Sequence, residues 1–277
     1  MIVNLAAGGW TAKLLPDHGA SFAALTCDGH NVLEPVPDGA DPNTAMAGAF
    51  WMAPWTNRLD EGRLGDLHSY PLNRLVERTA IHGTLRDRPW QVVMAAPAAA
   101  RLAVEDPTLP LACRAVLDVT LTDAGLALGL TLTSLSATIL PFGIGWHPWF
   151  VRPIGTEVGF RATHRFERDE RCLPIAVEPS TGLDGGEEAW RGQDTHWAGW
   201  DGVAGLDLGG LRVAMLATGA WARNLQLFAS PLKDVICVEP VSHVPDVINR
   251  PRFAGLGDMQ WLAPGAAMTG GVTLLRA

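Results

Sequence analysis

Alternation of apolar side chains with small or polar ones is the feature that most restricts how this chain can fold. Residues 126–132 carry leucine at every second position, with alanine, glycine and threonine between. A period of two is typical of a β-strand with one apolar face, because successive side chains point to opposite sides of a strand. Residues 115–121 alternate in the same way, and the turn-forming residues 122–125 lie between the two segments. The pattern predicts a β-hairpin over residues 115–132.

Further segments with strand character recur along the chain, at residues 211–216, 224–229, 235–239 and 271–275. The 30 glycines and 20 prolines interrupt the chain at short intervals, which is typical of many short strands joined by tight turns. No strand–helix alternation and no glycine-rich phosphate loop is present. We therefore expect an all-β fold that forms a single domain over residues 1–277. Residues 180–202, rich in Gly, Asp, Glu and Trp, are predicted to form a long loop.

Charge and cysteine content exclude several classes of partner. The net charge is −8 and no basic cluster occurs, so we expect no binding to nucleic acid or to an anionic membrane. Four cysteines, Cys27, Cys113, Cys172 and Cys237, lie far apart without a CxxC pair, and we expect buried free thiols. No secretory leader and no apolar run of about 18 residues is visible. Together these features predict a cytoplasmic protein.

Four polar residues stand out because they interrupt apolar or aromatic segments: Arg58, His82, His147 and Glu239. His147 lies in the run Gly-Trp-His-Pro-Trp-Phe, where an imidazole that titrates near neutral pH stands beside aromatic rings that can stack on a sugar. Glu239 follows four apolar residues, and burial would raise its pKa toward the range of a general base. Each residue also has a structural explanation, as a core histidine bonded to backbone or as a salt bridge at a loop or strand end.

The two histidines and the glutamate also match a metal site in ligand type. The spacing gives this interpretation no support, because no HxH or HExxH pattern occurs and the three residues fall on separate predicted strands. We therefore expect no metal and no other cofactor.

Five short motifs resemble those of the aldose 1-epimerase (galactose mutarotase) family and occur in the family's order. They are Asn57-Arg58, His82-Gly83, Gly143-x-Gly145-x-His147-Pro148-aromatic-Phe150, Asp194 before Gly199-Trp200-Asp201-Gly202, and Glu239-Pro240 followed by Pro245-Asp246 and Asn249. Any one of them is weak alone, but the ordered set spans most of the chain.

The resemblance implies a large antiparallel β-sandwich of the galactose mutarotase-like type, with a sugar-binding cleft across one sheet. It implies interconversion of the α and β anomers of a free aldose, without a cofactor. Glu239 would take the proton of the C1 hydroxyl, and His147 would protonate the ring oxygen, with His82 assisting. Sugar hydroxyls would be held by Asn57, Arg58, Asp194 and Trp149.

Departures from the family pattern keep alternatives open. Trp149 stands where tyrosine is more usual, Trp197 where phenylalanine is usual, and His196 has no counterpart. A non-catalytic sugar-binding protein or sensor on the same fold would not need the acid–base pair. A hexose-6-phosphate mutarotase would use arginines such as Arg63, Arg86 or Arg88. The preferred aldose is not specified by the sequence, and we expect a monomer or a homodimer.

Overall fold

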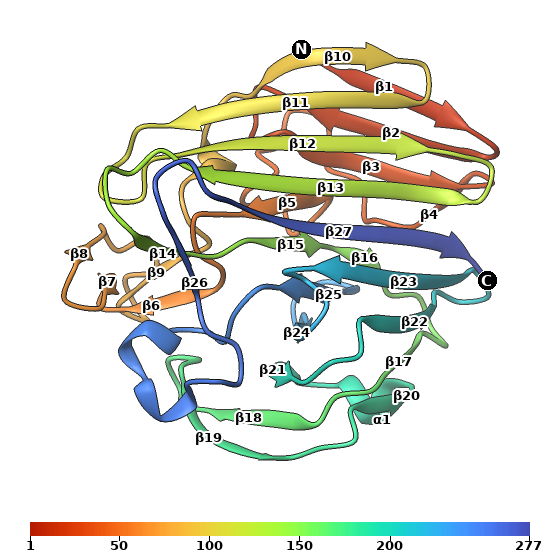
Figure 1. Cartoon of the computed structure of the whole chain (residues 1–277). Coiled ribbons are helices and arrows are strands. Elements are labelled where there is room, and N and C mark those ends of the chain that lie inside the picture. Colours follow the sequence, from red (N-terminus) through yellow and green to blue (C-terminus); the bar gives the residue numbers. More distant parts are fainter.

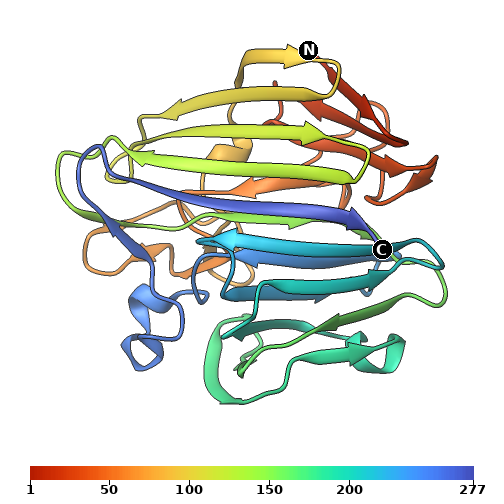
Figure 2. The same ribbon diagram turned by 45° about the vertical axis from the view of Figure 1, so that its right-hand side comes forward.

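Two large antiparallel sheets pack face to face in the computed structural model, which describes residues Met1–Ala277 (Figures 1 and 2). The first sheet has 12 strands, ten of which follow the order β1 (Val3–Ala7), β2 (Trp10–Leu15), β3 (Ser21–Cys27), β5 (Ala49–Met52), β15 (Gly145–Pro148), β25 (Val235–Val241), β24 (Asn224–Ala229), β21 (Asp194–Ala198), β18 (His164–Arg168) and β19 (Pro174–Pro179). The short strand β4 (His30–Asn31) pairs with β3, and β16 (Phe150–Val151) pairs with β25.

The second sheet has nine strands, in the order β10 (Gln91–Ala96), β11 (Ala99–Asp106), β12 (Cys113–Leu121), β13 (Gly125–Ser134), β27 (Ala267–Arg276), β23 (Arg212–Gly219), β22 (Val203–Asp207), β17 (Glu157–Phe160) and β20 (Leu183–Gly185). Three two-stranded ribbons complete the β-structure: β14 (Leu140–Phe142) with β26 (Gln260–Leu262), β6 (Arg58–Asp60) with β9 (Thr79–Ile81), and β7 (Arg63–Leu64) with β8 (His68–Ser69). Helices are short: α1 (Glu187–Trp190) and the 3₁₀ turns η1 (Leu85–Asp87), η2 (Val247–Asn249) and η3 (Pro251–Phe253). None of them is long and apolar enough to cross a bilayer.

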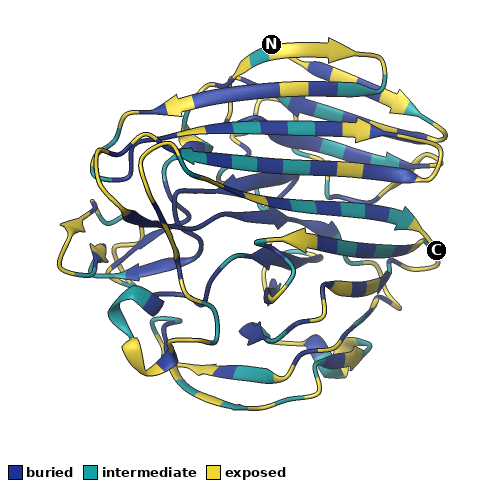
Figure 3. Ribbon diagram, viewed as in Figure 1, coloured by how far each residue is buried: buried dark blue, intermediate teal, exposed yellow.

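The alternating pattern of the sequence decides which face of the nine-stranded sheet is buried. In β12 and β13 the burial of successive residues alternates along the strand, and Figure 3 shows this as bands on the ribbon. The inward residues join a hydrophobic core of 68 buried side chains between the two sheets. The predicted hairpin and the four further strands are therefore confirmed, together with the all-β sandwich.

Two details of the prediction are wrong. Residues 180–202 are not one long loop, because they contain β20, α1 and β21. These strands pair with β17, β18 and β24, and their three to five residues are too few for a periodic pattern to be visible. Of the four cysteines, Cys172 is only half-buried, whereas the other three are buried free thiols as expected.

The 12-stranded sheet differs from its partner because its central strands are buried on both faces. All seven residues of β25 and all four of β15 are buried. One face packs against the nine-stranded sheet. The ribbons β6–β9 and β7–β8 are hydrogen-bonded to the turns that follow β25, and these segments meet at the lower left of Figure 1.

Side chains from the segment after β25 hold the chain at Asn57 and Arg58, where β6 begins. His243 Nε2 accepts a hydrogen bond from the Thr56 backbone N–H at 3.0 Å, and its Nδ1–H donates to the Val244 carbonyl at 2.9 Å. Asp246 Oδ1 accepts from the Asp60 N–H at 2.9 Å, which ties a second point of the same stretch of chain. Gly143 lies against His243, and a Cβ there would come within 2.2 Å of the imidazole Cδ2. The first glycine of the Gly-x-Gly motif therefore leaves room for this histidine.

The buried His243 should make stability depend on pH. Burial lowers its pKa from 6.5 to about 4, so between these values the unfolded chain binds more protons than the folded one. Its contribution to stability is complete above pH 6.5 and is lost as the pH falls toward 4. We expect His243→Gln to reduce the pH dependence of the unfolding free energy by at most ~1.4 kcal/mol per pH unit. Urea unfolding at pH 7, 6 and 5 measures this slope.

Equal slopes for the wild type and His243→Gln would contradict the prediction.

Candidate acid–base site on the twelve-stranded sheet

A row of side chains crosses the outer face of the 12-stranded sheet, the face turned away from the core. Phe50 on β5 pairs in register with His147 on β15, and Glu239 on β25 pairs with Gln226 on β24, which pairs with His196 on β21. The pairs Gly145–Val241 and Phe150–Ile236 on either side bring His147 opposite Glu239. Five strands, from β5 near residue 50 to β25 near residue 240, thus bring one residue each to the same line.

The neighbours of these residues along each strand face the opposite way, because side chains alternate across a sheet. Trp51, Trp146 and Trp197 point into the core between the sheets and are at most 1% exposed. Trp146 is therefore not a neighbour of the His147 ring, although it precedes it in the sequence. The imidazole lies instead between the Phe50 ring, at 4.5 Å between centroids, and the Trp149 ring, at 4.8 Å.

His147 and Glu239 are in close contact. Nε2 of His147 lies 3.4 Å from Oε1 of Glu239, and the two residues are 6% and 2% exposed. The His82 ring meets the His147 ring edge-on at 5.2 Å, and its backbone N–H donates to the Asn57 carbonyl at 2.9 Å. Gly83 follows with a φ of +70°, and a Cβ there would lie 2.0 Å from the Ala53 carbonyl oxygen. The glycine after His82 is therefore required by a close approach of backbone.

Arg58 is held by three groups. Its Nε donates to Glu77 Oε2 at 2.7 Å, its NH1 donates to Asn57 Oδ1 at 3.0 Å, and its NH2 lies 3.9 Å from Asp194 Oδ2. Asn57 adopts a left-handed φ of 52°, which asparagine tolerates better than most residues. Burial opposes the charge on Arg58, but Asp194 and Glu77 raise its pKa overall. The guanidinium is thus fixed in place as a cation.

Gln226 belongs to this cluster and was missed in the sequence. Its Nε2 donates to Asp194 Oδ1 at 2.8 Å, and its partner in register is Glu239, so it connects the Arg58–Asp194 pair with the acid–base pair. Asn224 and Gln226, two amides at alternate positions of an otherwise apolar strand, were the available signal. His196 has a structural explanation, since its Nε2 bonds Asn224 Oδ1 at 3.0 Å.

Burial disfavours the charged form of both members of the pair. It lowers the pKa of His147 to about 3, and the positive charges of Arg86, Arg74 and Arg58 act in the same direction. Burial also lowers the pKa of His82 well below 6.5, with His147 and Arg86 adding to the effect. The pKa of Glu239 is raised well above 4.5 by burial first and by Asp194 second, while Arg58 opposes the shift. Both shifts thus favour the neutral forms of the two groups, whose Nε2 and Oε1 atoms lie 3.4 Å apart.

Several polar atoms of the cluster are buried without a hydrogen-bond partner in the protein. They are His82 Nδ1, His147 Nδ1, Trp149 Nε1, Gln226 Oε1 and Glu239 Oε2. An unpaired buried donor or acceptor costs about 1–3 kcal/mol, so such groups are rare and each one requires an explanation. A ligand with several hydroxyl groups would satisfy donors and acceptors alike.

Metal-ligating atoms also meet in this cluster, but not in the combination considered from the sequence. Ligand atoms of His147, Cys237 and Glu239 lie within 4.8 Å of one another, and His82 is not part of this set.

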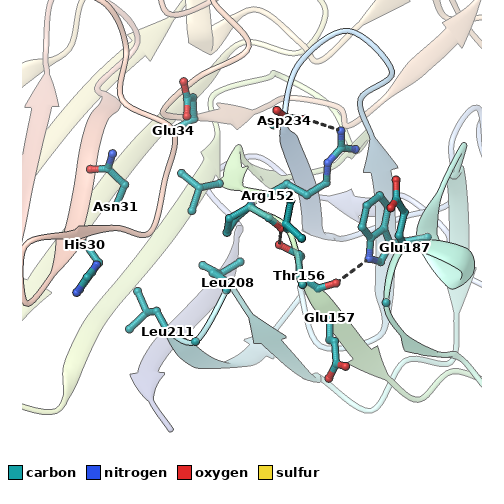
Figure 4. A pocket seen from close by; sticks show the side chains of 18 of the residues that line it. His30, Asn31, Glu34, Arg152, Thr156, Glu157, Glu187, Leu208, Leu211 and Asp234 are labelled. Atoms are coloured by element: carbon teal, nitrogen blue, oxygen red, sulfur yellow. Dashed lines mark hydrogen bonds and ion pairs between the residues drawn. The ribbon is translucent and has the colours of Figure 1, made fainter.

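A cavity of about 1150 Å³ lies elsewhere, where the loop after β16 meets α1 (Figure 4). Polar side chains that line this cavity already have hydrogen-bond partners within the protein. Arg152 NH1 donates to the Ser230 carbonyl at 3.0 Å, and Trp190 Nε1 donates to the Thr156 carbonyl at 3.2 Å. The cavity has no acid–base pair comparable to that of His147 and Glu239, so we place the candidate chemistry on the sheet face.

Comparison with known proteins agrees with this fold. The family model for aldose 1-epimerase matches residues 1–208, which include Arg58, His82 and His147 but not Glu239. The uncharacterised protein YphB of Escherichia coli (strain K12) is 29% identical over 250 residues, covering 82% of this chain and 83% of that protein.

Two solved structures share the fold over nearly the whole chain. A candidate aldose 1-epimerase of Escherichia coli K12 superimposes with a TM-score of 0.87 at 24% identity, covering 99% of this chain and 98% of its own. A galactose mutarotase-like protein of Clostridium acetobutylicum gives 0.83 at 20% identity, covering 98% and 93%. Since the family model matches 208 of the 277 residues, this chain belongs to the aldose 1-epimerase family.

Proposed function

We propose that the protein is a cofactor-independent aldose 1-epimerase, which interconverts the α and β anomers of a free aldose. One observation carries the proposal. An acid–base pair with a 3.4 Å separation lies among buried polar atoms that have no partner in the protein. Ring opening of a cyclic sugar needs one proton removed from the C1 hydroxyl and one proton added to the ring oxygen, and an adjacent donor and acceptor meet that need.

The proton count of the pair is the one that the reaction requires. The neutral acid with neutral imidazole, and the carboxylate with imidazolium, hold the same number of protons. Transfer across the His147–Glu239 contact interconverts them, so the two groups titrate as one unit. Burial favours the neutral form in the free site, whereas Arg58 favours the carboxylate. A sugar whose hydroxyls bond the carboxylate would shift the balance toward the reactive form.

In that form the Glu239 carboxylate takes the C1 hydroxyl proton, and the His147 imidazolium gives its proton to the ring oxygen. The C1–O5 bond breaks, and C1 becomes an open-chain aldehyde. Rotation about C1–C2 presents the other face of the carbonyl group to the O5 hydroxyl. His147 then takes back the O5 proton, Glu239 returns its proton to O1, and the ring closes as the other anomer with every proton accounted for.

The surrounding residues have positioning and binding roles in this proposal. His82, edge-on to His147, would donate or accept at the ring oxygen or a neighbouring hydroxyl. Arg58, held by Asn57, and Asp194, held by Gln226, would bond the hydroxyls further from C1. Trp149 would offer its unpartnered Nε1–H and its ring, which is 8% exposed.

A non-catalytic sugar-binding protein is the alternative of a different class. Binding alone needs unpartnered donors and acceptors, but it does not need a buried carboxylic acid whose pKa is raised and which touches a neutral imidazole. The contact between His147 and Glu239 therefore favours catalysis.

A phosphorylated aldose is a second candidate substrate, and it has one observation in its favour. The guanidinium of Arg86 lies 4.6 Å over the Phe50 ring that stacks on His147, and its Nε makes no hydrogen bond, with Asp87 Oδ1 3.7 Å away. Arg88 forms a closer ion pair, at 2.6 Å, with the buried Asp106. Comparing D-glucose with its 6-phosphate, using the wild type and Arg86→Gln, separates the two substrates. A preference for the phosphate that is lost in the variant would favour the phosphorylated sugar.

Replacing the carboxylic acid at Glu239 tests the proposal directly. Glu239→Gln keeps the shape of the side chain but removes the exchangeable proton, so we expect the rate to fall by about 10²–10⁴-fold with sugar binding retained. Polarimetry on freshly dissolved α-D-glucose and α-D-galactose measures the rate, and calorimetry measures binding. Glu157→Gln, an exposed change on the other sheet, should retain full activity. Wild-type protein that binds these sugars but does not accelerate their mutarotation would contradict the proposal.

The pH dependence of the rate supplies a second test. The pair loses its shared proton as the pH rises through the raised pKa of Glu239, so the rate should fall on the alkaline side. The charge of Asp194 contributes to raising that pKa, and Asp194→Asn should therefore move the alkaline fall to lower pH. Profiles of kcat/KM for the wild type and the variant would reveal the shift. If Asp194→Asn lowered the rate equally at every pH and left the pH of the alkaline fall unchanged, the effect of Asp194 on the pKa of Glu239 would be contradicted.

A further inference from the structure

Cys237 lies beside the acid–base pair, and the reaction proposed above makes no use of it. It stands two residues before Glu239 on β25, so both side chains leave the strand on the same face. Its thiol is fully buried in a small apolar cluster with Phe50, Met52 and Trp149. Its Sγ and the ligand atoms of His147 and Glu239 all lie within 4.8 Å of one another.

We propose that His147, Cys237 and Glu239 form a binding site for a soft divalent cation such as Zn²⁺, and that the bound ion blocks the acid–base pair.

The positions of the three residues suit such an ion. Zn–N and Zn–O bonds of about 2.0–2.1 Å and Zn–S bonds of about 2.3 Å, at tetrahedral angles, place neighbouring ligand atoms roughly 3.3–3.6 Å apart. The His147 Nε2 to Glu239 Oε1 distance of 3.4 Å already falls in this range. For all three ligand atoms to reach one ion, it is therefore mainly the Cys237 side chain that must rotate. The ligands come from two adjacent strands of a sheet, which hold their backbones in place.

The chemistry of the ligands selects the class of cation. A thiolate and an imidazole favour zinc or cobalt over magnesium or calcium, which prefer oxygen ligands. On binding, the thiol and the carboxylic acid release their protons to solvent. The thiolate and carboxylate then balance the two charges of the ion. The resulting complex is neutral, so it avoids the large cost of burying a net charge.

The surroundings indicate a reversible site and not a permanent structural one. A histidine that ligates a metal usually donates its other ring N–H to an acceptor that fixes its orientation, and this support raises the affinity. The Nδ1 of His147 has no such partner, and the set supplies only three protein ligands. A closed structural zinc site has four.

Inhibition follows from shared atoms, and this part of the inference rests on the proposed function. Nε2 of His147 and the carboxylate of Glu239 are the atoms that carry protons to and from the sugar. Lone pairs bound to a cation cannot accept protons, so the ion and turnover exclude each other.

Binding is tested first, because it needs no enzymatic activity. Co²⁺ added to the purified full chain should give the thiolate-to-metal charge-transfer absorption of a Cys-ligated site, and Zn²⁺ should displace it with one ion per chain. Cys237→Ser and Cys237→Ala should abolish the absorption and weaken Zn²⁺ binding by at least about 10- to 100-fold, the loss that even a supporting residue causes. Cys113→Ser, which removes another buried free thiol on the other sheet, is the matched control and should bind as the wild type does.

Inhibition is tested second, in the polarimetric assay. Micromolar Zn²⁺ should slow the wild type and Cys113→Ser, and chelation should restore the rate. Both Cys237 variants should keep their basal rate and resist the ion. Glu239→Gln should also lose Zn²⁺ affinity, which checks the site by a second ligand if a Cys237 variant fails to fold. Equal Zn²⁺ affinity in the wild type and the Cys237 variants, or no charge-transfer absorption, would overturn the inference. Normal metal binding without any mutarotation would overturn only the proposed function.

Discussion

The antiparallel pairing between β15 and β25 is the constraint on which the rest of the site depends. It places His147 opposite Glu239 on the outer face of the sheet, and Trp146 and Val238 on the face that packs into the core. A slip of one residue would reverse both faces, so that an indole replaced the imidazole. The core prevents such a slip, because Trp146 is fully buried among 68 core residues. Packing between the sheets thus fixes the register that creates the acid–base pair.

A second requirement is that the outer face of this sheet be covered without being filled by apolar residues. Arg58 and His82 reach this face from outside the sheet. The segment after β25 holds the chain around Arg58, because His243, Asp246 and Asn249 accept hydrogen bonds from the backbone N–H groups of Thr56, Asp60 and Gly65. Asp246 and Asn249 belong to the last of the five sequence motifs. These bonds give them a structural role that requires no contact with a ligand. They hold the backbone beside Arg58, whose guanidinium lies 3.9 Å from Asp194.

Burial under this cover determines the chemistry that the site can perform. A histidine and a glutamic acid in contact would form an ion pair in water, but here the lost hydration makes the neutral forms more favourable. Arg58 and Asp194 act on the pKa of Glu239 in opposite directions, Arg58 lowering it and Asp194 raising it. The same dehydrated ligands, with the neighbouring thiol of Cys237, form the set that we assign to a soft cation.

The sequence by itself determined the class of fold and predicted most residues of the candidate site. Strict alternation in residues 115–132 required a half-buried hairpin, and the ordered motifs around Arg58, His82, His147 and Glu239 matched one family. Only the tertiary structure decided which residues meet. Gln226 and Cys237 carry no motif, and they lie near the His147–Glu239 pair because strand pairing brings β25 beside β15 and β24 beside β25. Strand order and register across distant segments depend on packing of the whole core, and a local pattern contains no information about either.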